Sequence, residues 1–360
     1  MSIYHTTSVA SALALLFSAG QAQAAGSYGN HHLHSAPITV VAAPAPTPAP
    51  TPAAAPAATV TAAATTAATT TSATRVSVYV GNTTAGLNQF QSWLGRGVDT
   101  LELQGGAASW SDWKSSLSWQ ASLFRPMSVD ILWSVPLIPK GATLDAAATG
   151  AYDANYKALA QQFLNLWPND QQIYLRVGWE FNGTGWFPWS AVGKATQYKA
   201  AFRHFVLAFR SVSPTRFKFE WTPNIGNVGM DPTTAYPGDD VVDVIGMDFY
   251  YDTKWLGTDP AKAWNTTVNE KWGLQWHQDF AAAHNKPTAY AEWGVNSDTA
   301  GPYLTLADQW FTSHHVLYQN YWNSNSNFAA EMSNGQYPHA AATYKSVFGK
   351  KAKVGAFTVP

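Results

Sequence analysis

Short apolar runs alternate with helical repeats from residue 75 to about residue 350. Eight of these runs, each of five to nine residues, are rich in Val, Ile, Phe, Tyr and Trp, which is typical of buried β-strands. We predict strands at 76–80, 98–104, 129–135, 173–179, 217–222, 241–249, 287–293 and 316–322.

Two helical repeats are clear between these runs. In 153–167 and in 194–212, apolar residues recur every three or four positions, as on one face of an α-helix. The stretch after the fifth run, IGNVGMDPTTAYPGDD, contains three Gly and two Pro and is predicted to be a loop. Strands that alternate with helices form parallel sheets, and eight such strands close a barrel. We therefore predict an α/β fold, a single (β/α)8 TIM barrel over residues 75–355.

The residues before the barrel follow two other patterns. The apolar run 9–19, followed by Ala22 and Ala24, is typical of a secretory signal peptide and predicts the removal of residues 1–24. In 25–74 the composition turns to Ala, Pro, Thr and Val, which offer too little large apolar surface to fold, so we predict a disordered linker. The protein is therefore expected to be secreted or periplasmic.

Charge and composition narrow the class of partner. The 21 Lys and Arg nearly balance the 22 Asp and Glu, for a formal net charge of −1, which argues against nucleic acid or an anionic membrane as a partner. No apolar run is long enough to span a membrane. The chain has no cysteine, which excludes disulfides and thiolate metal sites. We expect a monomer with a near-neutral ligand and with neither metal nor cofactor.

Two glutamates stand at the ends of predicted strands. Glu180 follows the fourth run in YLRVGWEFNGTGWFPW, and Glu292 ends the seventh in AYAEWGV. The catalytic groups of (β/α)8 enzymes lie at the carboxyl ends of the strands, and strands four and seven face each other across the barrel mouth. Cleavage of a glycosidic bond needs two carboxyl groups, because one protonates the leaving oxygen while the other attacks the sugar or activates water.

Aromatic residues crowd around Glu180. Trp179, Phe181 and Trp186 would disfavour its ionised form by excluding water, as a general acid near neutral pH requires. Their rings would also stack on the faces of sugar rings. The alternative interpretation is a pair of structural acids in an aromatic core. Because buried unpaired carboxylates are costly and uncommon, the pattern favours catalysis.

RVGWEFNGTGWFPW resembles the acid/base motif of glycoside hydrolase family 26 in clan A, where the fourth strand ends roughly as R-P-x-H-E-M-N-G-x-W-F-x-W. Three further stretches are similar to the family's fifth, sixth and seventh strands in the same order: EWTPN (220–224), DVIGMDFY (243–250) and AEWG (291–294). Trp179 stands where the family usually has His, and NGTGWF is one residue longer than the family's NGxWF. The resemblance therefore indicates the reaction class more firmly than the substrate.

The resemblance implies a retaining double displacement, with Glu180 as the acid/base, Glu292 as the nucleophile and Tyr250 in contact with the nucleophile. The two carboxyl groups would then lie roughly 5–5.5 Å apart. The substrate-binding residues that it implies are Arg176, Trp179, Asn182, Trp186, Trp189, Asn224, Trp293 and Trp322.

Hypotheses of two kinds stay open. The first is an exported retaining endo-β-glycosidase that hydrolyses a polysaccharide: a β-mannan, a β-1,3-xylan, a mixed-linkage β-glucan or an exopolysaccharide. An enzyme of another clan A family would keep the mechanism and change the substrate. The second is a catalytically silent polysaccharide-binding barrel, which would not need both glutamates. Glu220, Asp243 and Asp248 are competing carboxylates. We interpret Asp243 and Asp248, which lie within a predicted strand, as members of ion pairs or as loop caps, and Glu220 precedes the end of the fifth strand.

Overall fold

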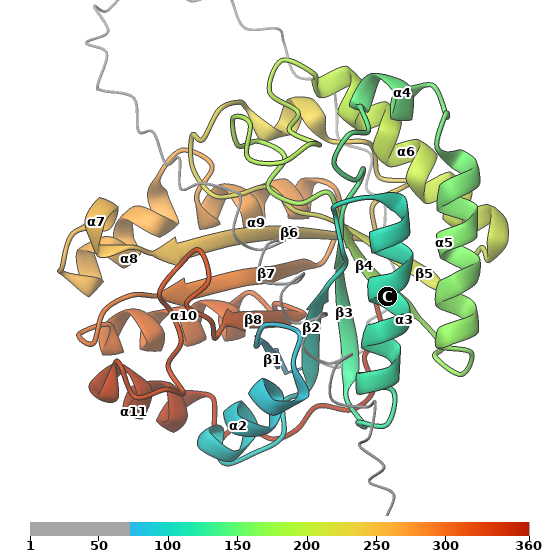
Figure 1. Cartoon of the computed structure of the whole chain (residues 1–360). Helices are drawn as coiled ribbons and strands as arrows, with labels where there is room; N and C mark the ends of the chain where they lie inside the picture. The colour runs from blue at the N-terminus through green and yellow to red at the C-terminus, as the bar shows by residue number, and fades with distance from the viewer. Residues whose placement is uncertain (1–72, 360) are drawn as a thin grey trace, which may run out of the picture.

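The computed structural model describes residues 73–359. The predicted signal peptide, 1–24, lies outside these residues, and so does the predicted linker except for its last two positions. From residue 75 onward the chain forms a closed barrel of eight strands with helices packed around it (Figure 1).

The strands follow one another around the barrel in sequence order, and each is parallel to its neighbours. Parallel pairing of β8 with β1 closes the ring. The strands are β1 (Arg75–Tyr79), β2 (Thr100–Gln104), β3 (Asp130–Val135), β4 (Ile173–Val177), β5 (Phe217–Trp221), β6 (Val244–Tyr251), β7 (Thr288–Val295) and β8 (Tyr318–Trp322). Each overlaps one predicted strand, so the predicted (β/α)8 TIM barrel is confirmed.

Helices fill the connections on the outside of the barrel. They are α2 (Thr84–Leu94), α3 (Trp110–Phe124), α4 (Leu144–Ala148), α5 (Asp153–Leu166), α6 (Ala195–Val212), α7 (Thr253–Leu256), α8 (Pro260–Asn269), α9 (Leu274–Ala283), α10 (Gly301–Ser313) and α11 (Pro338–Val347). The two predicted helices are confirmed as α5 and α6. Between β5 and β6 the described chain has only a 3-10 turn, η1 (Pro232–Ala235), as the Gly and Pro content predicted. None of the helices within 73–359 is long and apolar enough to cross a membrane.

The barrel interior changes from apolar to charged along the strands. Every strand buries both faces, one against the helices and one inside the barrel. Near the amino ends the interior is filled by a separate apolar cluster: Leu132, Tyr174, Val244, Ala289, Ala291 and Tyr318. Beyond this cluster, toward the carboxyl ends of the strands, the side chains that point into the barrel become polar or charged. The chemistry of the molecule is therefore concentrated toward the carboxyl ends.

The C-terminal segment closes the amino end of the barrel. The Phe357 ring lies 5.0 Å from that of Tyr174 and 6.0 Å from that of Tyr318. The guanidinium of Arg75 donates to the carbonyls of Gly355 and Ala356. The chain thus packs against the amino end of the barrel as far as Phe357.

Candidate active site

Glu180 lies just beyond β4 in a left-handed backbone conformation, with φ of 51°, two residues after Gly178 at 55°. For a residue other than glycine this conformation costs on the order of 1–3 kcal/mol and persists only where the surroundings hold it. Here the Glu180 N–H donates to the Thr222 carbonyl over 2.8 Å, and the Glu180 carbonyl accepts from the Gly183 N–H over 3.1 Å. These bonds to β5 and to the following turn fix the direction of the Glu180 side chain.

Two asparagines hold the Glu180 carboxyl group. The Asn224 amide donates to Glu180 Oε1 over 2.5 Å. Asn182 in turn holds the backbone of Asn224 with two hydrogen bonds of 2.8 Å. The Asn224 N–H donates to Asn182 Oδ1, and the Asn182 side-chain amide donates to the Asn224 carbonyl. Asn182 has no exposed surface. This corrects its predicted place in a sugar subsite, because it acts on Glu180 through Asn224.

The environment of Glu180 favours its protonated form. Burial raises the pKa of the Glu180 carboxyl to about 7, and the nearby Glu292 adds to the rise, whereas the bond from Asn224 and the charge of Arg176 act against it. The predicted effect of excluding water is thus present. Near neutral pH a substantial fraction of Glu180 holds a proton, as a general acid requires.

Glu292 faces the barrel interior because β7 contains a bulge. Opposite β6, Gly246 pairs with Ala289 and Asp248 with Glu292, so β7 has one residue more than β6 over this stretch. The register with β8 shifts in the same way between Tyr290 and Trp293. The extra residue allows Ala291 and Glu292 both to face inward, and bulges near active sites commonly redirect side chains in this way.

Both oxygens of Glu292 accept hydrogen bonds from neighbouring strands. Arg176 Nη1 on β4 donates to Oε1 over 2.7 Å, and the Tyr250 hydroxyl on β6 donates to Oε2 over 2.9 Å. The contact between Tyr250 and Glu292 that the resemblance implied is therefore present. The Phe328 ring, from the loop after β8, packs 4.6 Å from the Tyr250 ring. No sequence signal marked Phe328, since its loop has no regular pattern.

Arg176 lies inside the barrel among acidic side chains. Besides Glu292, its guanidinium donates to Asp248 and to Glu102, the latter over 3.3 Å. Only 1% of the residue is exposed. Its predicted role in binding substrate is thereby corrected, because the guanidinium neutralises and positions carboxylates beneath the mouth.

Glu102 is a further member of this cluster, and no motif in the sequence predicted it. Its side chain, on β2, accepts from the Ser134 hydroxyl over 2.6 Å and from the Asn320 amide over 2.5 Å. Burial and the proximity of Glu292 raise the pKa of Glu102 to about 8, although Arg176 opposes the rise. Burial also raises the pKa of Asp248 well above its ordinary value. A charged residue inside the apolar run of β2 was the available signal.

Trp179 and Trp189 form a buried aromatic layer behind Glu180. The Arg176 guanidinium lies 5.0 Å from the centre of the Trp179 ring, and the centre of the Trp189 ring also lies 5.0 Å from that of Trp179. The Trp189 indole N–H donates to the Trp179 carbonyl over 2.7 Å, and 1% of Trp189 is exposed. This corrects the predicted sugar contact of Trp189, because the buried ring supports Trp179 instead. Trp179 itself is 7% exposed.

Trp293 points away from the mouth. It has no exposed surface, its ring packs on Phe249 and Phe311, and its indole N–H donates to Gln319. This corrects the prediction of a sugar contact. The period of a strand puts Trp293 on the face opposite Glu292, where it meets the helices.

Trp186 and Trp322 occupy different settings. Trp186 is half-buried over Gly183, where a Cβ atom would come within 2.2 Å of the indole, so only glycine fits beneath it. Trp322 ends β8 and stacks on Tyr79 with ring centres 4.2 Å apart. Trp322 is mostly buried, so only a small part of its ring is open to a ligand.

The competing carboxylates have structural partners. Glu220 lies inside the barrel next to the apolar cluster at the amino ends, and it accepts from the hydroxyls of Tyr174, Tyr318 and Thr222. Asp243 accepts from the Phe219 N–H and pairs with Arg210. Asp248 pairs with Arg176, as described above. Within 73–359, no group of three or more His, Cys, Asp or Glu side chains is arranged to hold a metal ion.

Comparisons with known proteins point to one family of enzymes. Residues 138–270 match the family model described as glycosyl hydrolase family 26. A mannan endo-1,4-β-mannosidase of Bifidobacterium adolescentis is 31% identical over 131 residues, which are 35% of this chain and 12% of that protein. The chain thus spans about an eighth of that relative's length.

Solved structures share the fold. A family 26 β-mannanase from Bacteroides ovatus has a TM-score of 0.57 at 15% identity, over 80% of this chain and 92% of that one. The catalytic domain of an endo-β-1,4-mannanase of the same family from Bacillus sp. JAMB-750 has 0.55 at 17%, over 77% and 85%. A β-mannanase from a symbiotic protist of the termite Reticulitermes speratus has 0.55 at 15%, over 79% and 88%. Together the comparisons confirm the predicted resemblance to glycoside hydrolase family 26 and the (β/α)8 fold.

Proposed function

With residues 138–270 matched to glycosyl hydrolase family 26, we propose that this chain is a retaining endo-β-glycosidase that cleaves a β-mannan or a related β-linked polysaccharide. The observation that carries the proposal is the pair of unlike carboxyl groups. Glu180 is largely buried with a pKa of about 7, whereas Arg176 and Tyr250 donate to both oxygens of Glu292. One group is suited to give a proton and the other to attack.

The reaction has two steps. Glu180 gives its proton to the glycosidic oxygen while an oxygen of Glu292 attacks the anomeric carbon, so the glycosidic bond breaks and a glycosyl ester of Glu292 forms. Glu180, now ionised, then takes a proton from water. The resulting hydroxide adds to the anomeric carbon, and the ester bond breaks to restore Glu292. Two displacements at one carbon leave its configuration unchanged.

The proposed substrate rests on the relatives, which are named as mannanases. The near-zero net charge fits a neutral polymer. Trp179 in place of the usual His leaves β-1,3-xylan, mixed-linkage β-glucan and exopolysaccharide as alternatives. We also propose that residues 1–24 are a signal peptide, that residues 25–74 are a disordered linker, and that the catalytic domain follows the linker. The protein would then be secreted or periplasmic. It would act on polysaccharide as a monomer and would not bind nucleic acid.

The test is hydrolysis of a panel of mannan, xylan, lichenan and bacterial exopolysaccharides. We expect reducing sugar from one of them, with an early fall in viscosity that marks internal cleavage. Proton NMR of the first product should show the β anomer. A protein that binds a polymer but releases nothing from it would be a silent binding barrel, and an α anomer as first product would indicate inversion.

Replacement of Asn224 by Ala is expected to move the basic limb of the kcat/KM profile to higher pH. Because the acid must be protonated, wild-type activity should fall as the pH rises through about 7, the pKa of Glu180. The Asn224 bond lowers that pKa, so its loss should raise it, while kcat falls because the carboxyl group is less firmly held. Asn334→Ala, in the exposed loop after β8, is the control. An unmoved or lowered limb would contradict the assignment of Glu180.

A further inference from the structure

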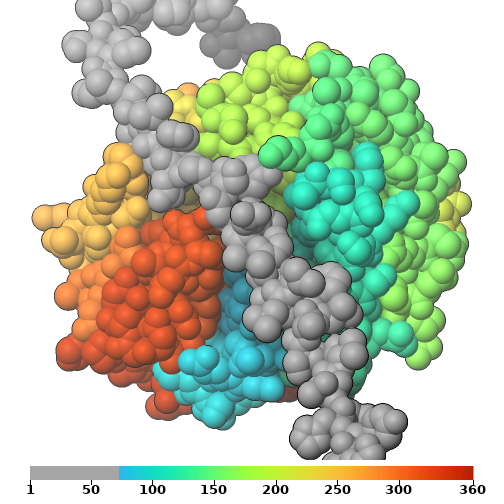
Figure 2. Space-filling model, viewed as in Figure 1, coloured from blue at the N-terminus to red at the C-terminus, as the bar shows by residue number. Residues whose placement is uncertain are grey.

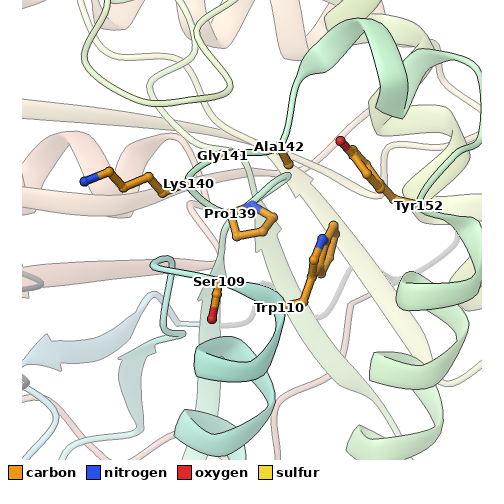
Figure 3. A pocket seen from close by; sticks show the side chains of 7 residues that line it. All are labelled: Ser109, Trp110, Pro139, Lys140, Gly141, Ala142 and Tyr152. Atoms are coloured by element: carbon orange, nitrogen blue, oxygen red, sulfur yellow. The ribbon is translucent and has the colours of Figure 1, made fainter.

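A pocket opens among the loops at the carboxyl end of the barrel (Figure 3). It has a volume of about 260 Å³ and is formed by the loops after β2 and β3 and by the start of α5. Its lining residues are Ser109, Trp110, Pro139, Lys140, Gly141, Ala142 and Tyr152. Loops that follow the strands of a (β/α)8 barrel all lie at its carboxyl end, as Glu180 and Glu292 do.

The pocket presents flat, firmly supported apolar surfaces. The rings of Trp110 and Tyr152 lie 5.3 Å apart on one side, and Pro139 lies across from Trp110, whereas Lys140 extends away from the rings (Figure 3). The fully buried Trp113 stacks on Trp110 at an interplanar angle of 12°. Since Trp113 supports the indole from the core, the half-buried Trp110 meets the pocket with its outer side. Such a surface suits the C–H face of a sugar ring.

The polar groups of the pocket have unused hydrogen-bonding capacity. The Ser109 hydroxyl accepts from the Asp112 N–H, and the Tyr152 hydroxyl accepts from the Thr143 N–H. Neither hydroxyl donates to another group in the described chain, and the Trp110 indole N–H likewise makes no hydrogen bond within 73–359. No acidic side chain lines the pocket. Lys140 lines the pocket but extends away from the rings (Figure 3), so the free donors beside the flat ring are suited to the hydroxyl groups of an uncharged sugar.

An adjoining pocket connects this surface to the loop that follows Glu180. It has a volume of about 310 Å³, shares Ala142 with the first pocket, and is lined on its other side by residues of the loop 184–194. In the space-filling view, the green surface that follows β3 meets the yellow-green surface that follows β4 (Figure 2). Thr143, which lines the second pocket, also donates its N–H to Tyr152 in the first. The two pockets therefore adjoin at Ala142, and the second one reaches the loop that follows Glu180.

We propose that the pocket of Trp110, Pro139 and Tyr152 is a distal subsite that binds an uncharged pyranose of the polysaccharide chain, several sugars away from the bond that is cleaved. The inference rests on the proposed function for the identity of the polymer. It predicts that affinity increases with chain length until the substrate reaches Trp110. Short oligosaccharides that occupy only the carboxylate site gain nothing from this pocket.

The test compares Trp110→Ala with Trp119→Ala, a half-buried tryptophan of the same helix that does not line the pocket. Trp110→Ala should raise KM for the polymer about tenfold, the loss of one ring-stacking contact, while kcat is kept. KM for the shortest cleaved oligosaccharide should be unchanged. Tyr152→Phe, which removes only a hydroxyl, should give a smaller rise in the same direction and serves if Trp110→Ala fails to fold.

Binding to the Glu180→Gln variant, measured by gel retardation in the presence of polymer, separates this inference from the proposed function. Retardation that depends on Trp110 supports the subsite even if no polymer of the panel is cleaved. Hydrolysis with equal KM values for wild type and Trp110→Ala on the polymer would overturn the subsite and leave the proposed function intact. An equal rise in KM for short and long substrates would also overturn it, because the pocket would then act on the carboxylate site itself.

Discussion

Replacement of Glu292 by Gln is expected to lower kcat on the cleaved polysaccharide by at least about a thousandfold, because the amide cannot form the glycosyl ester. The amide keeps the size of the side chain, so the hydrogen bond from Arg176 and the fold should be retained. Turnover of the polymer and of an activated aryl β-glycoside of the same sugar measures the effect. Both should fall, since both pass through the same ester.

Azide distinguishes the two glutamates by the configuration of the product. In Glu292→Ala, azide fits the space left by the carboxylate and attacks the anomeric carbon of the aryl β-glycoside directly, so the product is the α-glycosyl azide. In Glu180→Ala, the Glu292 ester forms first from the activated substrate, and azide then displaces it from the other face. That product is the β-glycosyl azide.

Glu331→Gln, in the loop after β8, is the matched control because it makes the same change of charge away from the interior cluster. It should retain wild-type turnover. Turnover by Glu292→Gln within tenfold of wild type would contradict the nucleophile assignment. An α-azide from the Glu180 variant and a β-azide from the Glu292 variant would exchange the two roles.

The sequence predicted the barrel well because a strand that is buried on both faces must be apolar over most of its length. The eight apolar runs therefore located all eight strands, and the helical period located α5 and α6. The contact between Tyr250 and Glu292 was predicted only through the resemblance to the family, and neighbouring strands β6 and β7 bring the two groups together. The sequence thus predicted where each strand lies in the chain and which residues lie near its carboxyl end.

Which face a side chain occupies was harder to predict. One extra residue in β7 puts Ala291 and Glu292 on the same face and turns Trp293 outward, and a bulge has no simple sequence signature. A tryptophan beside a candidate catalytic glutamate suits a sugar-binding platform and a core position equally well. Only the packing of Trp293 on Phe311 decides between them.

The buried acids needed the register of all the strands. Glu102 lies 74 residues before Arg176 along the chain, yet the barrel places the two side chains 3.3 Å apart. Its partners Ser134 and Asn320 come from two further strands. No local pattern predicts such a meeting, although a lone Glu in an apolar strand indicates that some partner must exist.

Replacement of Arg176 by Met is expected to lower the free energy of unfolding by about 3–5 kcal/mol, because its removal leaves buried carboxyl groups without their cation. The guanidinium lowers the pKa values of Glu102, Asp248 and Glu180. Without it, those values rise further above the ones in the unfolded chain. Urea unfolding at pH 5 and pH 8, compared with wild type, measures the change.

The sign of the pH effect follows from proton binding. An acid whose pKa is higher in the folded state binds more protons there, so stability is greatest at low pH and is lost as the pH rises toward the folded pKa. Glu102 has a pKa of about 8 even with Arg176 present, so wild type should already lose some stability between pH 5 and pH 8. The loss in Arg176→Met should be larger at pH 8 than at pH 5, and a second change, Glu102→Gln, should reduce that difference. Arg203→Met breaks an exposed pair with Asp240 and a bond to the Pro237 carbonyl, and should cost roughly 1 kcal/mol, to the same extent at both pH values. Equal losses for the Arg176 variant at both pH values would mean that the guanidinium serves packing alone, with no role in keeping the acids of the barrel ionised.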